Sequence, residues 1–304
     1  MLPDKPILVD LSYKGLLCAS GPDAVAFLQG QFSTDLERLT PDISQLSCWS
    51  NAKGRVVAVL RLFRRGEHIH IALAASLKSA VLKRLSMYVL RSKVQLEDAG
   101  DSISTLGLIG EGAPALLAQA GIPVPSRVND LTRMDGIQAI RLHGDSRYAI
   151  YGGAEAMAVL KRRWEPVTTS GTEDIWALHK ILAGEPTVFA ETSEHFVAQM
   201  LGLAELGAID FKKGCYIGQE VIARAHYRGG VKRHMVRAES RTSVQLRPGA
   251  QIHAQGHDAP VAEVVDARQD AQDIWQILMV LQDDFKDAAL LHAASGAPMK
   301  LVSW

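Results

Sequence analysis

The sequence predicts an α+β protein with two mixed units, 1–100 and 101–235, followed by a small C-terminal β-barrel over 236–304. A chain of 304 residues that is 47% hydrophobic can bury a large core and is long enough for two or three domains. Its first two thirds alternate between strand-like and helix-like apolar spacing, whereas short alternating runs follow Arg233. The first two units can interleave.

Two helices are predicted in the first unit. One is expected from Ala24 to Gly30, because Pro22 and Asp23 are typical of a first helical turn. The other is expected over 76–91, where four apolar residues recur at helical spacing. These residues are Leu77, Val81, Leu85 and Tyr88.

Strands are predicted from runs of β-branched residues bounded by turn residues. Residues 55–63 and 68–73 flank a turn-like segment and predict a hairpin, and 139–142 and 148–151 predict a second one. A further strand is expected over 102–110 and a loop over 121–125. A helix capped by Thr172 should end before Gly184 and Pro186. The barrel strands are expected at 236–238, 250–253, 261–265 and 274–280.

Composition limits the possible partners and the compartment. The formal net charge is zero and no apolar run approaches the length of a membrane span, so we expect no membrane and no chain-wide nucleic-acid surface. Three scattered cysteines fit a reducing, cytoplasmic setting, with Cys18 and Cys48 as packing residues. His68 and His70 lack further ligands at zinc spacing, so an exposed strand face is the favoured interpretation and no metal is expected.

The most informative segment is Lys-Gly-Cys-Tyr-Ile-Gly-Gln-Glu at 213–220. Cations and a helix N-terminus both lower a cysteine pKa, and Cys215 is followed by a predicted helix and preceded by Lys213. We therefore expect a reactive thiol at Cys215, activated by Lys213. The alternative is a small buried cysteine beside a solvated lysine.

Residues around the thiol can bind polar groups. Gln219 and Glu220 suit an amide or amidine edge, although Glu220 can equally be a first-turn helix acid. Arg224, Arg228 and Lys232 can hold a carboxylate or phosphate, or form a solvated face. Residues 212–233 carry six Lys or Arg against one acid.

This segment resembles the signature of the YgfZ family of folate-binding proteins, which continues through Ala-Arg and a basic tail. Ala223-Arg224 and Tyr227-Arg228-Gly229 match that continuation. Weaker similarities are spread over roughly the first 235 residues. They are Phe27 to Gln31, Thr34-Asp35, Lys53-Gly54-Arg55, Tyr88 to Val94, Ala183-Gly184 and Pro186.

The resemblance implies a fold similar to the glycine-cleavage T-protein, with two mixed α/β (ferredoxin-like) units and a small barrel around a central channel. It implies binding of tetrahydrofolate or a derivative, with Tyr216, Gln219, Glu220, Arg224 and Arg228 at the ligand. It also implies a role in iron-sulfur cluster assembly or repair, with iron-sulfur client or assembly proteins as partners, including radical enzymes that modify tRNA.

Departures from the family pattern bear on activity. Val57-Ala58 stand where the T-protein has a paired Asp, which disfavours the alternative function, a folate-dependent aminomethyltransferase. Leu182 replaces a glutamate expected near the pterin, and Ala198-Gln199 replaces Pro-Gln. A third interpretation, direct RNA binding, is ranked last because Tyr216 and Tyr227 are the segment's few aromatic residues.

Overall fold

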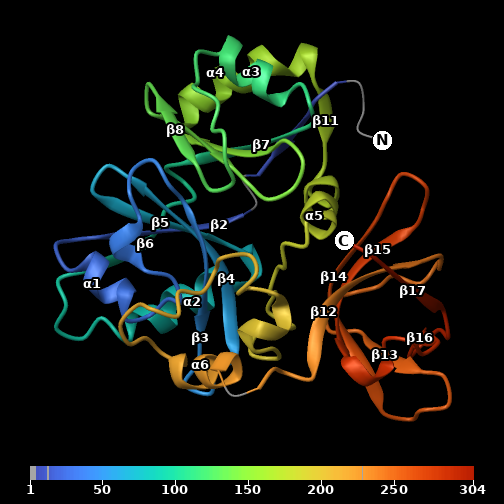
Figure 1. Ribbon diagram of the computed structural model, residues 1–304. Helices are drawn as coiled ribbons and strands as arrows, with labels where there is room; N and C mark the ends of the chain where they lie inside the picture. Colours follow the sequence, from blue (N-terminus) through green and yellow to red (C-terminus); the bar gives the residue numbers. More distant parts are fainter. Residues whose placement is uncertain (1–4, 12–13, 228) are drawn as a thin grey trace. The chain divides into compact units, whose positions relative to one another are not determined.

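The computed structural model describes residues 5–11, 14–227 and 229–304 (Figure 1). Arg228, a predicted ligand residue, lies outside them. The chain forms two compact units. The first unit consists of Met1–Leu28, Asp35–Leu46 and Leu60–Trp176, and the second of Gln29–Thr34, Ser47–Val59 and Ala177–Trp304.

A six-stranded sheet in the order β11-β1-β7-β10-β9-β8 forms part of the first unit. Its strands are β11 (Thr169–Gly171), β1 (Ile7–Asp10), β7 (Ser104–Ile109), β10 (Arg147–Gly152), β9 (Ile137–Arg141) and β8 (Leu131–Met134). β1 pairs in parallel with β11 and antiparallel with β7, so sequence-distant segments become neighbours. The predicted strand over 102–110 and the second predicted hairpin are confirmed.

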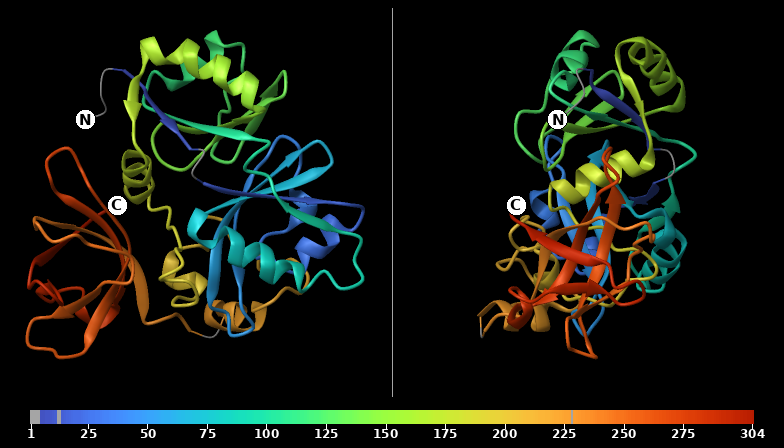
Figure 2. Two further views of the ribbon diagram at one scale, coloured as in Figure 1. Left: turned by 180° about the vertical axis from the view of Figure 1, so that it is seen from behind. Right: turned by 90° about the vertical axis from the view of Figure 1, so that its right-hand side faces the viewer.

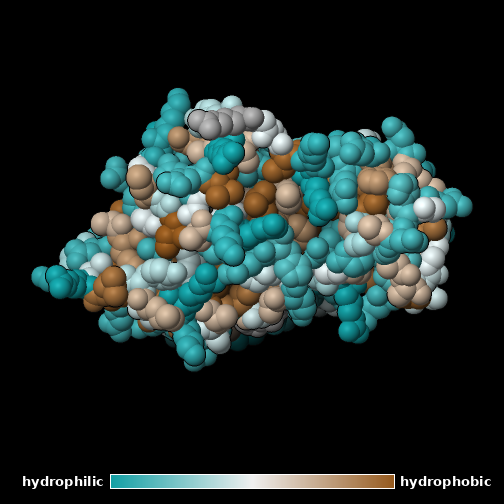
Figure 3. All heavy atoms as spheres, turned by 90° about the horizontal axis from the view of Figure 1, so that it is seen from below, coloured by the Kyte–Doolittle hydropathy of each residue, from teal (hydrophilic) through white to brown (hydrophobic). Residues whose placement is uncertain are grey.

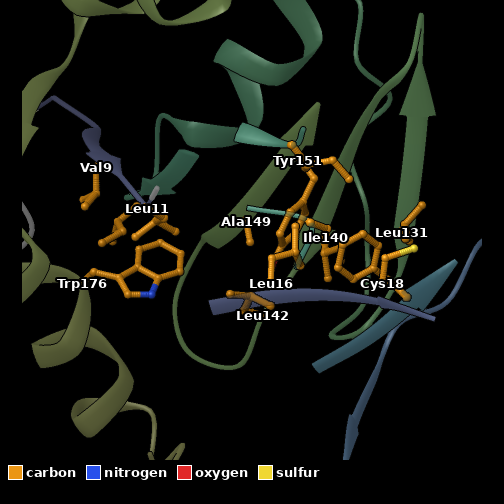
Figure 4. Packing of buried hydrophobic residues seen from close by; sticks show 14 of the residues in the cluster. Val9, Leu11, Leu16, Cys18, Leu131, Ile140, Leu142, Ala149, Tyr151 and Trp176 are labelled. Atoms are coloured by element: carbon orange, nitrogen blue, oxygen red, sulfur yellow. The ribbon is translucent and has the colours of Figure 1, made fainter. Parts of the chain in front are cut away.

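The two faces of this sheet bury different hydrophobic cores, because successive strand residues point to opposite faces. Tyr148 and Ile150 of β10 pack with α3 (Ala113–Gln119) and α4 (Ala154–Trp164), which lie on one face of the sheet (Figures 1 and 2). Ala149 and Tyr151 belong to the other core, together with Val9, Leu11 and Trp176 (Figure 4).

A five-stranded sheet has the order β3-β4-β5-β2-β6. Its strands are β3 (Gln45–Ser50), β4 (Val56–Arg65), β5 (His68–Leu73), β2 (Gly15–Ser20) and β6 (Gln95–Asp98). The predicted hairpin is β4 and β5, and the first predicted helix is α1 (Ala24–Gln29). β3 and β4 contribute residues to both units.

Two predictions for the five-stranded sheet and the helix beside it, those for the end of α2 and for His70, need correction. The second helix, α2 (Ala75–Ser86), buries Leu77, Val81 and Leu85 but ends before Tyr88, which is 40% exposed. The chain leaves the helix there through a turn that contains Leu90 at φ 47°. His70 is buried and stacks on Phe63 with ring centroids 5.3 Å apart, so the expected exposed strand face is wrong for His70.

The segment between the six-stranded sheet and the barrel is mostly helical or irregular. Its helices are α5 (Glu173–Leu182), η3 (Ala198–Leu201) and α6 (Gln219–Tyr227), while the short helix η2 (Glu165–Val167) lies between α4 and β11. Thr172 accepts a hydrogen bond from the backbone N–H of Ile175, and Gly184 has φ 65°, as the predicted start and end of α5 require. A further short helix, η1 (Leu36–Arg38), lies in the first unit.

The C-terminal strands close into a barrel in the order β12-β15-β14-β13-β16-β17 (Figures 1 and 2). They are β12 (Arg233–Ser240), β13 (Gln251–Ala254), β14 (Pro260–Gln269), β15 (Trp275–Gln282), β16 (Leu290–His292) and β17 (Pro298–Val302), with η4 (Asp283–Phe285) after β15. Alternate residues of β15, Ile277, Met279 and Leu281, point into its core. The predicted α+β fold with a terminal barrel is confirmed.

The surface is mixed in character. On the face shown in Figure 3, small separate groups of hydrophobic residues lie among hydrophilic ones. No helix in the described part of the chain combines the length and the apolar character needed to span a membrane.

Candidate functional site

The 213–220 segment forms a loop that leads into α6, and all of it belongs to the second unit. Figure 1 shows α6 beside the ends of β3 and β4. The predicted helix after Gly218 is confirmed and runs to Tyr227. Cys215 therefore precedes a helix, as the sequence indicates.

Lys213 is buried and holds a distant loop. Its Nζ atom donates hydrogen bonds to the carbonyl oxygens of Gln29, Phe32 and Thr34, at 2.7, 2.6 and 2.8 Å. It also lies 5.0 Å from the centroid of the Tyr216 ring. An ammonium group has three donors and pays a large desolvation cost when buried, so three carbonyl partners explain how Lys213 is tolerated in the interior.

Ser33 lies at the centre of a buried polar network beneath this loop. Its hydroxyl donates to the carbonyl of Ala208 at 2.6 Å and accepts from the backbone N–H of Cys48 at 2.9 Å. Thr34 donates to the Ser47 hydroxyl at 2.8 Å, and the backbone N–H of Asp210 donates to the Ser33 carbonyl at 2.9 Å. These bonds connect residues 29–34, β3 and residues 208–213 into one framework.

Two glycines allow α6 to approach the turn between β3 and β4. Gly218 has φ 84°, and a Cβ there would lie 2.6 Å from the Asn51 carbonyl oxygen. Gly54 has φ 69°, and a Cβ there would lie 2.7 Å from the Cβ of Val221. Both positions need a left-handed backbone and a missing side chain, which only glycine supplies without strain.

Further contacts fix the orientation of α6. The side-chain amide of Gln199 donates to the carbonyl of Ile222. Phe211 stacks on His226 with ring centroids 3.8 Å apart, and Tyr227 packs edge-on against both rings. The helix is therefore anchored along its length to segments that precede it in the chain.

The three cysteines have different environments. Cys215 is exposed, whereas Cys18 and Cys48 are buried, as predicted for packing residues. Burial raises the pKa of the thiols of Cys18 and Cys48, although Ser33 and Ser50 oppose this shift at Cys48 through hydrogen bonds. Of the three cysteines, Cys215 is therefore the accessible one, and the two buried thiols are also disfavoured as thiolates.

The other predicted site residues divide into buried and accessible ones. Tyr216 is buried, and burial together with Cys48 and Asp210 raises the pKa of its phenol. Gln219 is half-buried, while Glu220 and Arg224 are exposed on α6. Lys213 donates to three carbonyls, so its predicted effect on the Cys215 thiol remains a prediction.

Two glutamines carry buried acceptors that the sequence interpretation did not assign. The side-chain oxygens Oε1 of Gln31 and Gln199 are buried without a hydrogen-bond partner. Gln31 lies in the loop that Lys213 holds, and Gln199 is bonded through its amide nitrogen to α6. An unpaired buried acceptor is costly, so both oxygens suit a ligand with N–H donors. Both glutamines belong to segments that the sequence analysis compared with the family, Gln31 in the Phe27 to Gln31 similarity and Gln199 in the departure at Ala198-Gln199.

The departures noted in the sequence have structural counterparts. Val57 and Ala58 are buried in β4 and supply no acid there. Leu182 is 39% exposed at the end of α5, and nearby Glu185 is buried with its carboxylate 3.6 Å from Nζ of Lys180. Among the described residues, no group of three His, Cys, Asp or Glu is arranged to hold a metal ion.

Comparison with known proteins gives a consistent set of relatives. No family model matches the chain. It is 33% identical over 229 residues to "tRNA-modifying protein YgfZ" of Pectobacterium carotovorum, covering 75% of this chain and 68% of the relative. The protein of the same name from Cronobacter sakazakii is 31% identical over 82% of this chain and 75% of its own length. The protein of the same name from Colwellia psychrerythraea is 29% identical, covering 95% of this chain and 89% of the relative.

A solved structure shares the fold. The glycine cleavage system aminomethyltransferase T from Bartonella henselae superposes with a TM-score of 0.80, covering 98% of this chain and 85% of that one. At 18% identity, this similarity concerns the arrangement of helices and strands. The T-protein-like fold expected from the sequence is thereby confirmed.

Proposed function

Because the chain belongs to the family of proteins named tRNA-modifying protein YgfZ, we propose that it is a folate-binding accessory protein for iron-sulfur cluster assembly or repair. In this proposal it supports tRNA modification indirectly, through radical enzymes that depend on such clusters. The observation that carries the proposal is an exposed Cys215 on a loop that Lys213 bonds to residues 29–34, together with the buried, unpartnered Oε1 atoms of Gln31 and Gln199.

The residues present fit a tetrahydrofolate. The pterin ring offers an amino group and ring N–H donors, which match the buried Oε1 atoms of Gln31 and Gln199. The glutamate tail is anionic and suits the exposed guanidinium of Arg224. When bound, tetrahydrofolate would supply a reduced pterin. Gln219, Glu220 and Tyr216 complete the proposed ligand set.

Cys215 is proposed to act on the cluster pathway as a redox-active or transiently ligating thiol. Thiolates are the usual protein ligands of iron-sulfur clusters, and a single accessible thiol can form a temporary bond without retaining the cluster. The loop that carries it is fixed through Lys213 and Gly218, so the thiol is presented in a defined position.

An aminomethyltransferase, the alternative function, has less support. The fold is that of such an enzyme, but fold does not determine activity. Val57 and Ala58 place apolar side chains on β4 where the resemblance leads one to expect two acids. Incubation with tetrahydrofolate and an amine donor tests this alternative, since steady methylene-tetrahydrofolate formation would replace the accessory role with turnover.

Ligand binding and cellular function are tested separately. Calorimetric titration with tetrahydrofolate and its 5-formyl derivative should show binding that weakens at least tenfold in Gln31→Leu and Gln199→Leu and is unchanged in Cys215→Ser. In a deletion strain, Cys215→Ser should fail to restore cluster-dependent enzyme activity. Full restoration by Cys215→Ser would refute the thiol role, and no binding at submillimolar folate would refute the ligand.

A further inference from the structure

A second feature of the molecule lies in the first unit, at the end of α2. Met87, Tyr88 and Leu90 are 69%, 40% and 88% exposed, and Leu90 is the most exposed large apolar side chain in the described ranges. We call residues 87–93 the α2 turn. Three large apolar side chains within four positions differ from singly scattered surface residues, which need no explanation.

The α2 turn has a strained backbone at its most exposed residue. Leu90 adopts φ 47°, a left-handed conformation that costs free energy for residues that have a Cβ atom. Burial cannot compensate for this cost, because the side chain is directed into solvent. A strained, exposed leucine is therefore unfavourable in the isolated chain and calls for a contact outside it.

The turn is held firmly, so this strain is built into the fold. Within it, the N–H of Ser92 donates to the Val89 carbonyl at 2.8 Å. Its far end is fixed by the Asp23 carboxylate, which accepts from the N–H of Lys93 at 2.7 Å. Gly21, at φ 106°, sits so close to the Lys93 carbonyl that a Cβ there would collide with it. The backbone that carries Leu90 is consequently held by contacts on its C-terminal side.

The turn lies in a stretch of sequence that carries cations and no acid. Residues 79–96 contain four cations and no acid, and the cations are Lys83, Arg84, Arg91 and Lys93. Lys83, Arg91 and Lys93 are exposed. Asp23 lies close by but accepts the hydrogen bond from the Lys93 backbone. The exposed apolar side chains therefore have several exposed cations as sequence neighbours.

We propose that the α2 turn is a docking surface for a partner protein with an acidic surface and a shallow apolar pocket that receives Leu90. Methionine, tyrosine and arginine are enriched in protein interfaces, and a preorganised anchor residue in a pocket supplies much of the affinity. A fluid lipid surface gains nothing from a fixed leucine conformation. The turn has one aromatic residue and hence little capacity to stack nucleic-acid bases. This inference uses no residue of the proposed folate site.

The first experiment identifies what contacts the turn. A photo-crosslinking phenylalanine is placed at position 90 in the full-length chain in cells, and a matched control carries it at position 159, where Val159 is 54% exposed on α4. The label at position 90 should crosslink to a partner protein that the control at position 159 does not capture. Mass spectrometry should show that the crosslinked peptide of this partner is rich in Asp and Glu. Equal products at both positions would overturn the proposal, as would crosslinks to a second copy, RNA or lipid, or to a peptide without excess acid.

The second experiment measures binding of that purified partner. Leu90→Asp and Leu90→Gly should each weaken binding about tenfold or more, whereas Val159→Asp should bind as the wild type. Glycine relieves the left-handed strain, so the melting temperature of Leu90→Gly should not fall below that of the wild type, which separates lost binding from lost folding. Wild-type affinity in both Leu90 variants would refute the docking role.

Discussion

The three hydrogen bonds from the Lys213 ammonium group to the loop at 29–34, here called the Lys213 clamp, are tested by replacing Lys213 with methionine. Methionine keeps most of the apolar stem but removes three hydrogen bonds, to Gln29, Phe32 and Thr34. Each bond from a charged group contributes about 1.5–3 kcal/mol. Relief of the ammonium's desolvation, several kcal/mol, offsets part of that loss. We therefore expect Lys213→Met to lower the free energy of unfolding by about 3 kcal/mol.

Urea unfolding followed by circular dichroism and tryptophan fluorescence measures this change, because Trp49 is buried next to the clamped loop at a bridge with Phe32. The matched control is Lys212→Met, since Lys212 is exposed and adjacent in the sequence. It should change stability by less than about 0.5 kcal/mol. A Lys213→Met variant as stable as this control would refute the clamp.

Three further predictions follow from single sites. Gly218→Ala should destabilise the protein by about 2 kcal/mol in thermal unfolding, because Gly218 has a positive φ and a Cβ there would collide with the Asn51 carbonyl oxygen. The control, Gly214→Ala, should leave stability unchanged, because a Cβ at position 214 meets nothing within 4 Å. Equal melting temperatures of the two variants would contradict this prediction. Burial, with Arg65 and His68, lowers the pKa of His70 from 6.5 to about 4. Between pH 6.5 and 4 only the unfolded state binds a proton at His70, so the free energy of unfolding should fall by about 1.4 kcal/mol for each pH unit. In urea unfolding over this pH range, the free energy of unfolding of His70→Phe should fall less than that of the wild type. A thiol-reactive dye should label one cysteine rapidly in the native protein and none in Cys215→Ser; rapid labelling of Cys18 or Cys48 would disprove the assigned burial.

Local sequence rules predicted those elements whose causes are local. The α1 and α5 boundaries followed from capping residues, and the β4–β5 hairpin from a turn between apolar runs. The end of α2 was missed because helical spacing alone continues to Tyr88, whereas the chain turns at Ser86. β16 and β17 were missed because they are short and gain their order from pairing with each other and with the barrel.

The sequence predicted which residues belong to the site but not which distant residues they contact. The motif showed that Cys215 precedes a helix, and the glycines at 54 and 218 were both part of the quoted similarities. No local pattern indicated that Lys213 would reach a loop near position 30, or that His70 would be buried while His68 is exposed. Both depend on contacts between residues far apart in the chain, which periodicity does not report.

The large sequence separation between Lys213 and its carbonyl partners also sets an order of folding events during synthesis. Its partner at Gln29 precedes it by 184 residues, and that at Thr34 by 179. On a ribosome adding about 5–20 residues each second, the loop at 29–34 leaves the exit tunnel many seconds before the ammonium group that will hold it. Its carbonyls must remain hydrated for that interval, and any nascent chain stopped before Lys213 leaves them so. The loop that carries Cys215 can therefore reach its final structure only after most of the chain has been synthesised.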